Sequence, residues 1–341
     1  MRKRLWGSLV LSAVLVLTAA GCSTTEKQSS GNSSPEKKTY KIAVSQIVEH
    51  PSLDAIRNGF LAALKDNGIT EGTNLKLDVN NAQGDQTNNL SIAQKIQGDK
   101  DDLVLAITTP TALVIKKQVT ETPILFAGVS DPLGAKLIKD LDKPEGNITG
   151  ASDMNPEAVS KLAEFIAANF PKVKTVGIVL NTGESNAVTM AKHAEEAFGT
   201  HNIKVIQAPV TNTSEVKQAA ESLVGRADAL YVTLDNTVVE GVNSVISVAN
   251  AKHIPFFASD RDTVEKGAFA TVGFKYYDHG YQVGQMAVEI LKNGKKPSDL
   301  KVTVPEKLDF IMNLKAAKAQ GIEVTDAMKS AVKDQKTNII E

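Results

Sequence analysis

The stretch LVLAITTPTALVIKKQVTETPILFAGVSDP, residues 103–132, decides the fold. It opens with an apolar run at 103–108 and reaches a second apolar run at 123–129. Between them, Thr109 can cap a helix that begins at Pro110, where the missing N–H of proline costs nothing. Two continuous apolar strands around a helix are typical of a parallel sheet that is covered on both faces.

The same alternation runs through most of the chain. A helix is predicted over 52–68, where Ile56, Phe60, Leu61 and Leu64 share one face and Gly68 ends it, and another over 156–170. Further apolar runs predict strands at 40–46, 75–81, 175–181, 203–209, 229–235, 254–259 and 268–273. Two series of strands separated by helices predict an α/β protein with two lobes.

The connections between the lobes are harder to place. Residues 146–158, rich in Gly, Asn, Ser, Asp and Pro, are predicted as the first crossing. A helix at 276–295, an extended segment at 298–313 and a short closing helix at 314–321 follow. One consistent arrangement returns to lobe one near residue 273 and recrosses near residue 305. The predicted domains are 40–152 with 274–304 for lobe one, and 153–273 with 305–341 for lobe two.

The N-terminus carries the only cysteine of the chain, Cys22. A basic head at 2–4, an apolar run at 5–20 and small residues precede it, which resembles a bacterial lipoprotein signal. That resemblance implies removal of residues 1–21 and attachment of lipid to Cys22, with the protein held at the outer side of the cell membrane. A plain signal peptide with an incidental cysteine is the alternative. Residues 22–39 have no apolar face and are predicted to be a flexible linker.

The composition argues against several classes of function. The net charge is −1, and no basic stretch is interleaved with aromatic residues, so nucleic-acid binding is disfavoured. There is no G-x-G-x-x-G or Walker loop, and the serine in GESNA at 183–187 lacks the nucleophile-elbow pattern. The histidines are scattered, and His50 and His279 are assigned packing or hydrogen bonding. No catalytic residue, metal or cofactor is expected.

Polar residues gather where the predicted strands end. In open α/β sheets, ligands bind outside the carboxyl ends of the strands, close to helix N-termini. Helix capping explains any one of these residues, and Ser130 and Asp131 before Pro132 are predicted to form such a cap. Their presence in both lobes favours a ligand site. The candidate residues are Gln46, Asn81, Thr108, Thr109, Ser130, Asp131, Asp153, Glu184, Asn186, Asp235, Asn236 and Asp260.

Seven segments together resemble a known family. They are 45–54, 81–94, 107–113, 129–138, 146–156, 231–241 and 267–291, and they cover most of the chain in order. They are similar to the substrate-binding lipoproteins of ABC transporters, in the tryptophan-binding (TrpX-like) family. The resemblance implies a type I periplasmic-binding-protein fold, with two Rossmann-like lobes joined by three hinge strands. It also implies a monomer that delivers a small ligand, often an aromatic amino acid, to a membrane permease and its ATPase.

An amino-acid ligand needs donors for its carboxylate and acceptors for its ammonium group. We expect Thr109, Ser130 and nearby backbone N–H groups to hold the carboxylate. We expect Asp235, helped by Asp153 or Glu184, to hold the ammonium group, with capping of the following helix as an equal alternative for Asp235. Further polar contacts are expected from Gln46, Asn81, Asn186 and Asn236.

The ligand's side chain is less defined by the sequence. Phe274, Tyr276 and Tyr277 lie near a predicted hinge, where they stack on a flat ligand or only pack the hinge. Tryptophan or another aromatic amino acid is the favoured ligand, and a branched aliphatic amino acid or a nucleoside is the alternative. A ligand-sensing role is the alternative to transport.

Overall fold

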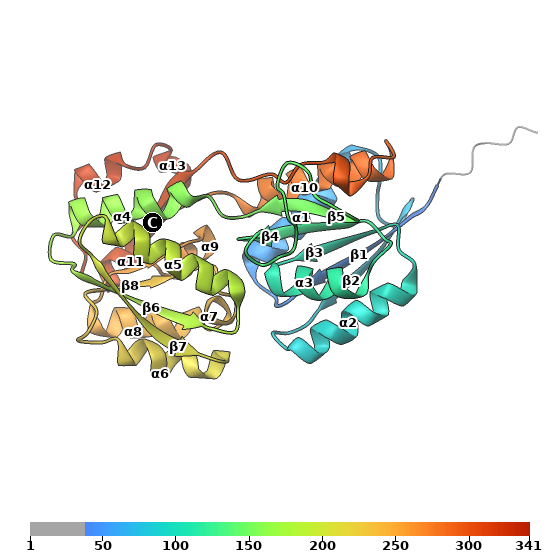
Figure 1. Ribbon diagram of the computed structural model, residues 1–341. Helices are drawn as coiled ribbons and strands as arrows, with labels where there is room; N and C mark the ends of the chain where they lie inside the picture. The colour runs from blue at the N-terminus through green and yellow to red at the C-terminus, as the bar shows by residue number, and fades with distance from the viewer. Residues whose placement is uncertain (1–37) are drawn as a thin grey trace, which may run out of the picture. The chain divides into compact units, whose positions relative to one another are not determined.

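A computed structural model describes residues 38–341, which form two α/β lobes (Figure 1). Lobe one is built on a five-stranded sheet of order β2-β1-β3-β4-β5, in which every pair of neighbours is parallel. Its apolar strands are buried on both faces, as predicted. The strands are β1 (Tyr40–Gln46), β2 (Leu75–Asn81), β3 (Leu103–Ile107), β4 (Ile124–Val129) and β5 (Ile148–Ser152).

Lobe two is built on a seven-stranded sheet of order β12-β11-β10-β9-β8-β6-β7. Its neighbouring strands are parallel except β10 and β11, which are antiparallel. The parallel majority confirms the predicted sheet type. The strands are β6 (Thr175–Asn181), β7 (Lys204–Val210), β8 (Ala229–Val232), β9 (Phe256–Ala258), β10 (Ala270–Gly273), β11 (Asp309–Asn313) and β12 (Ile339–Ile340).

Helices cover both faces of the sheet in lobe one. Helices α1 (Pro51–Asp66) and α10 (Tyr276–Leu291) share one apolar core with β1 and β3. Helices α2 (Gln86–Asp99) and α3 (Thr109–Gln118) contribute to a second core on the opposite face. Helix α10 therefore completes lobe one, although it follows the strands of lobe two in the chain.

The backbones of α1 and α10 approach each other closely. A Cβ atom added at Gly280 would lie 2.0 Å from the carbonyl oxygen of Ile56, and one added at Gly59 would lie 2.0 Å from that of Tyr277. Only glycine fits at these two positions, because any side chain would overlap with the backbone of the other helix.

Lobe two is covered in the same way. Helices α4 (Pro156–Asn169) and α5 (Ser185–Gly199) pack on one face of the sheet, and α6 (Val216–Ser222) and α8 (Val242–Lys252) pack on the other. The remaining elements are short: α7 (Asn236–Glu240), α9 (Arg261–Lys266), α11 (Leu314–Ala319), α12 (Asp326–Ser330), α13 (Gln335–Asn338), η1 (Thr213–Glu215) and η2 (Pro297–Asp299).

The chain passes between the lobes three times: after β5, after β10 and between η2 and β11. The first and third crossings lie side by side (Figure 1). The N–H of Ser152 donates to the carbonyl of Thr303 at 2.8 Å, and the side-chain amide of Asn155 donates to the carbonyl of Pro305 at 2.9 Å. These bonds tie two of the connections into one hinge.

Several predicted elements were wrong in detail. The segment predicted as the first crossing, 146–158, also contains β5 before the chain crosses, and the helix at 314–321 does not close the chain, because α12, α13 and β12 follow it. The strand predicted at 229–235 ends at residue 232. Thr109 is the first residue of α3, and Thr108 is its cap. Asp131 closes a turn rather than capping a helix, since its Oδ1 accepts from the N–H of Gly134 at 2.8 Å.

Cys22, the predicted signal peptide and nearly all of the predicted linker lie outside the described residues. Within residues 38–341, no helix combines the length and the apolar character that crossing a membrane requires.

Candidate functional site

A cavity lies where the strand-end loops of the two lobes meet. Its walls come from the ends of β1, β3 and β4 in lobe one, from the ends of β6, β8 and β9 in lobe two, and from the crossing after β5. The lining residues are Val48, His50, Ser52, Leu53, Thr108, Gly128, Asp153, Asn186, Leu234, Asp235, Asn236, Val239, Asp260 and Tyr276.

Asp153 and Asp260 are buried carboxyl groups in the wall of this cavity. Oδ1 of Asp153 and Oδ2 of Asp260 have no hydrogen-bond partner among the described residues. Burial raises the pKa of Asp153 to about 6; Asp260 adds to this shift, while the Ser130 hydroxyl opposes it. Burial likewise raises the pKa of Asp260 to about 6. Each group offers a free acceptor oxygen, which a positively charged group would stabilise in its ionised form.

Asp235 and Glu184 are also buried, but their oxygens are already bonded. Asp235 caps α7: its Oδ1 accepts from the N–H of Val238 at 3.1 Å, and its Oδ2 accepts from the N–H of Asn181 at 2.6 Å. Burial, followed by the charge of Glu184, raises the pKa of Asp235. The two oxygens of Glu184 accept from the N–H groups of Asn236 and Thr237 at 3.2 and 3.0 Å. These bonds account for both carboxyl groups as caps of α7.

The predicted site residues divide into two groups. The residues that line the cavity are Thr108, Asp153, Asn186, Asp235, Asn236 and Asp260. The residues that the structure places outside its lining are Gln46, Asn81, Thr109, Ser130, Asp131 and Glu184.

Asn186 has one free acceptor. Its Oδ1 is buried and has no hydrogen-bond partner among the described residues, whereas its Nδ2 donates to the carbonyl of Leu234 at 2.8 Å.

Gln46 and Asn81 are engaged in local bonds. Gln46 donates through Nε2 to the carbonyl of Val48 at 3.0 Å and accepts through Oε1 from Arg57 at 3.0 Å. The side-chain oxygen of Asn81 accepts from the N–H of Gln83 at 2.8 Å. Both residues therefore shape the strand-end loops of lobe one.

Thr108 has an unusual backbone, with φ 84° and ψ 157°. Only glycine adopts this region readily, so the conformation costs about 1–3 kcal/mol. The N–H of Thr108 donates to the carbonyl of Ala127 at 2.9 Å, and its carbonyl accepts from the N–H of Ala112 at 3.0 Å. These two hydrogen bonds, to β4 and within the first turn of α3, hold Thr108 in its strained conformation beside the cavity.

Eight lining residues were absent from the candidate site residues, and only one of them, Tyr276, had been considered as a stacking partner of the ligand. They are Val48, His50, Ser52, Leu53, Gly128, Leu234, Val239 and Tyr276. His50 and Ser52 come from the first turn of α1, and Tyr276 comes from that of α10. The signal for His50 was its position immediately before Pro51, after a strand. A residue that precedes a proline at the start of a helix is the N-cap, and this helix begins at the carboxyl edge of the sheet.

His279 contacts the cavity wall from behind. The N–H of Gly128 donates to Nε2 of His279 at 3.1 Å. Burial lowers the pKa of His279 to about 4, so the imidazole is neutral and serves as an acceptor. The hydrogen-bonding assignment for this residue agrees with its geometry.

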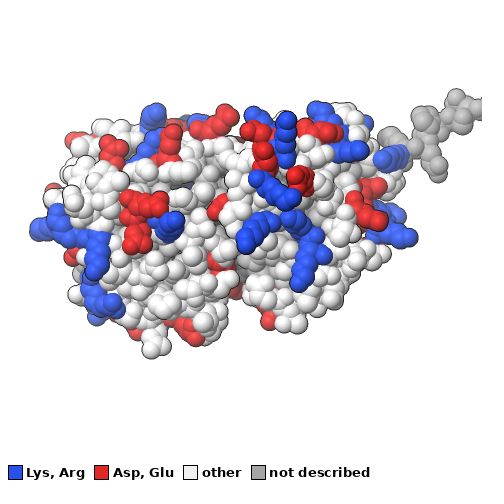
Figure 2. Space-filling model, in the orientation of Figure 1, with Lys and Arg blue, Asp and Glu red and all other residues white. Residues whose placement is uncertain are grey.

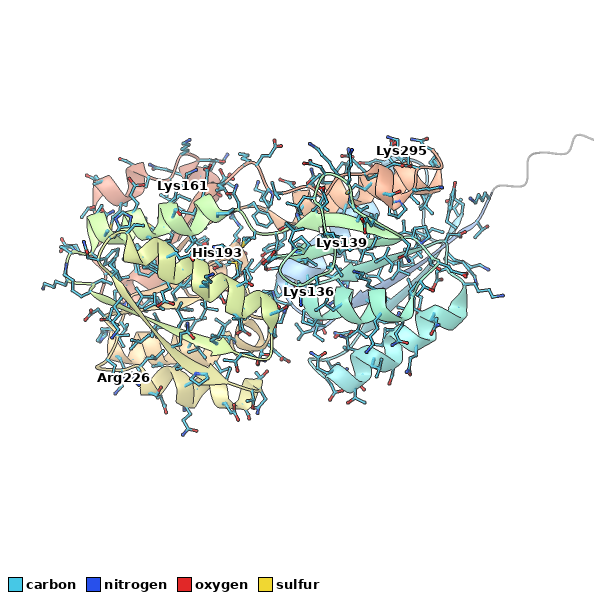
Figure 3. All side chains as sticks on the ribbon, in the orientation of Figure 1. Lys136, Lys139, Lys161, His193, Arg226 and Lys295 are labelled. Atoms are coloured by element: carbon cyan, nitrogen blue, oxygen red, sulfur yellow. The ribbon has the colours of Figure 1, made fainter. Side chains whose placement is uncertain are left out.

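Among the described residues, the cavity lining contains no lysine or arginine. Basic side chains such as Lys136, Lys139 and Arg226 lie on the outer surface instead (Figures 2 and 3). No group of three or more His, Cys, Asp or Glu within residues 38–341 is placed to hold a metal ion. The site therefore presents acidic and neutral polar groups to a small ligand.

One direct bond joins the lobes across the cavity. The hydroxyl of Ser52, on α1, donates to the carboxylate of Asp262, on α9. This contact requires the two lobes to be close together at the mouth of the site.

Comparisons with known proteins agree with this architecture. A family model described as ABC transporter substrate binding protein matches residues 41–336. The chain is 38% identical over 324 residues to a tyrosine-binding protein of Clostridioides difficile, covering 94% of this chain and 93% of the relative. A Streptococcus pneumoniae ABC domain in complex with L-Trp has a TM-score of 0.83 and 31% identity, covering 89% of this chain and all of that one.

A third relative is described as ligand-free and open. The ligand-free, open structure of a C. difficile substrate-binding protein is 39% identical and covers 89% of this chain and 98% of its own, yet its TM-score is only 0.66. The score against the L-Trp complex is higher at lower identity. Together with the bond between Ser52 and Asp262, this difference indicates that the lobes of this chain are closed.

The two parallel-dominated lobes, the three crossings and the cavity between the strand ends are those of a type I periplasmic binding protein. The family model extends over nearly all of the described residues. The chain belongs to the ABC transporter substrate-binding protein family.

Proposed function

We propose that this protein binds an aromatic L-amino acid, tyrosine or tryptophan, between its lobes. The observation that carries the proposal is the pair of buried carboxyl groups, Asp153 and Asp260. Within residues 38–341, each has an oxygen without a hydrogen-bond partner, and no basic side chain lines the cavity. Both carboxyl groups suit the ammonium group of an amino acid. The relatives described as tyrosine-binding and as an L-Trp complex support the aromatic class.

The aromatic side chain of the ligand contacts the apolar part of the cavity lining. The aromatic ring packs against apolar lining residues, and Tyr276 offers a ring edge or face to it. The apolar side chains are Val48, Leu53, Leu234 and Val239. Because the contacts come from both lobes, the ligand stabilises the closed arrangement over the open one.

Calorimetric and thermal-shift titration of the purified protein tests the proposal. L-tyrosine or L-tryptophan at about a hundredfold excess over the dissociation constant should add about 2.7 kcal/mol of stability. L-leucine, adenosine and glucose should give no comparable shift. A protein that responds to neither aromatic amino acid contradicts the proposal.

Asp153→Asn gives a sharper test of the site. Removing a buried charge partner of the ammonium group should weaken L-tyrosine binding by about tenfold or more. Asp131→Asn is the matched control, because Asp131 is a neighbouring carboxylate that closes a turn outside the cavity. Equal affinities of the two variants would overturn the role of Asp153.

Delivery of the ligand to an ABC permease and its cytoplasmic ATPase is the second part of the proposal, with Cys22 as the point of lipid attachment. Membership of the family supports delivery, and the N-terminal sequence supports the anchor. Deleting the gene should reduce uptake of radiolabelled tyrosine or tryptophan by the cells. Restoring uptake with wild-type protein, but less well with Cys22→Ala, would support the lipid anchor. Full restoration by Cys22→Ala would count against it.

A further inference from the structure

His50 occupies a special place in the cavity. It is the N-cap of α1, directly after the first strand of lobe one, and only 4% of its surface is exposed. Its Nδ1 accepts a hydrogen bond from the N–H of Ser52 at 3.3 Å. Its Nε2 is buried and has no hydrogen-bond partner among the described residues.

The position of the proton on this ring follows from these contacts. Since Nδ1 accepts from a backbone N–H, it carries no proton. Burial, with a contribution from Lys266, lowers the pKa of His50 to about 3, so the ring is neutral near pH 7. The single proton of a neutral imidazole is then on Nε2. The cavity wall thus contains a buried N–H donor whose bonding capacity is unused.

We propose that His50 is a ligand-binding residue, whose Nε2–H donates a hydrogen bond to the carboxylate of the bound amino acid. The inference rests on the proposed function, since it concerns how that ligand is held. It assigns the carboxylate to the start of α1, which differs from the earlier expectation of Thr109 and Ser130 in lobe one.

The surroundings favour a carboxylate as the partner. The first turn of α1, a helix of 16 residues, carries the partial positive charge of its unpaired N–H groups, which stabilises an anion. Two carboxylates already lie at this end of the helix. Asp54 is paired with Arg57 at 3.0 Å, and Asp262 accepts from the hydroxyl of Ser52, so neither occupies Nε2 of His50. In the part of the chain that the structure describes, no lysine or arginine lines the cavity to compete for the ligand's carboxylate. Asp153 and Asp260 are suited to the opposite end of the ligand, the ammonium group.

A neutral donor at this place has a consequence for selectivity. It makes a strong, charge-assisted bond to an amino acid but none to the corresponding amine, which has no carboxylate. We therefore expect the protein to prefer tyrosine to tyramine, and His50 to account for much of that preference.

The variant His50→Asn separates this role from helix capping. Asparagine is among the best N-cap residues, so its side-chain oxygen can still accept from the N–H of Ser52, but it is too short to reach as far as Nε2. Dissociation constants of L-tyrosine and tyramine are measured by calorimetry on wild-type protein and on the variant. The variant should bind L-tyrosine about tenfold to a hundredfold more weakly and tyramine with unchanged affinity.

Two results would overturn the inference: unchanged binding of L-tyrosine, or an equal loss for both ligands, which would indicate a structural role. Failure of the wild-type protein to bind tyrosine or tryptophan would instead contradict the proposed function on which this inference rests.

A second test uses only the wild-type protein, so it does not depend on whether the His50→Asn variant folds. The ratio of tyrosine to tyramine affinity should stay constant between about pH 6 and about pH 8, because His50 stays neutral and both ligands carry the same ammonium group. A ratio that falls as the pH rises through this range would mean a charged imidazole, and would contradict the neutral donor.

Discussion

At the scale of single residues, Asp153 and Asp260 should make ligand binding depend on pH. Both pKa values are raised to about 6 in the folded protein. Their protonated forms stabilise the fold below about pH 4, and this contribution is lost as the pH rises through about 6. An ammonium ligand needs the ionised forms, so its affinity should change in the opposite direction.

We predict that L-tyrosine binds about tenfold more tightly at pH 7 than at pH 5 for each carboxyl group that must lose its proton. Calorimetry in two buffers of different ionisation enthalpy measures both the affinity and the protons released. Binding that is independent of pH over this interval, with no proton release, would count against an ammonium contact at these residues.

Asp235 gives a second prediction at this scale, since it is described equally well by capping and by ligand contact in the sequence alone. We predict that Asp235→Ala destabilises the protein by about 2 kcal/mol, because a buried cap of α7 is lost together with the bond to the N–H of Asn181. Denaturant unfolding measures the loss.

The control for this variant is Asp85→Ala, which removes the exposed cap of α2. It should cost less, about 1 kcal/mol. If Asp235→Ala keeps its stability and loses ligand affinity, then Asp235 contacts the ligand.

At the scale of elements, the packing of α1 on α10 depends on glycine. We predict that Gly280→Ala destabilises the protein by about 1–3 kcal/mol, because the new methyl group overlaps with the carbonyl of Ile56 and forces the helices apart. Thermal or denaturant unfolding measures this.

Gly98→Ala is the matched control. Gly98 lies in α2 with open space around its Cα, so alanine should stabilise the protein by up to about 1 kcal/mol through its higher helix propensity. Similar effects of the two substitutions would show that the helix contact is not the cause.

Much of this architecture was predictable from the sequence, because buried parallel strands are long apolar runs. The bounds of β1, β2 and β6 agree with the predicted strands. Strand β5 was missed because its sequence, ITGAS, is short and has a single bulky apolar side chain, Ile148, and because it lies at the edge of its sheet. The antiparallel direction of β11 has no counterpart in its apolar pattern, since the same run suits either direction.

The site was predictable in outline only. Strand ends and residue types identify Asp235 and Asp260 equally well, and both are N-caps in the structure. They differ in the second oxygen: that of Asp235 accepts from the N–H of Asn181, whereas that of Asp260 has no partner among the described residues. Such a difference depends on how two loops approach each other, which local sequence does not encode.

At the scale of the whole molecule, the bond between Ser52 and Asp262 contributes to closure of the lobes. We predict that Ser52→Ala weakens ligand binding by about three- to tenfold, because a bond worth about 1 kcal/mol is lost from the closed state only. Small-angle scattering should show a larger radius of gyration for the variant at sub-saturating ligand.

Ser160→Ala is the control, since the hydroxyl of Ser160 bonds within α4, to the carbonyl of Pro156. It should leave both quantities unchanged. A loss of affinity in Ser52→Ala without any change in scattering would mean that Ser52 acts on the ligand rather than on closure.

The passage of α10 back to lobe one has a consequence for the order in which the chain can fold. All five strands of the first sheet are complete at Ser152, but the helix that covers α1 ends only at Leu291. When the chain emerges N-terminus first, during synthesis or export, the apolar face around Ile56 and Phe60 stays uncovered until the strands up to β10 have emerged. Lobe two needs β11 and β12 from the last residues as well. Both lobes therefore depend on late segments, and we expect them to complete their folding at nearly the same stage.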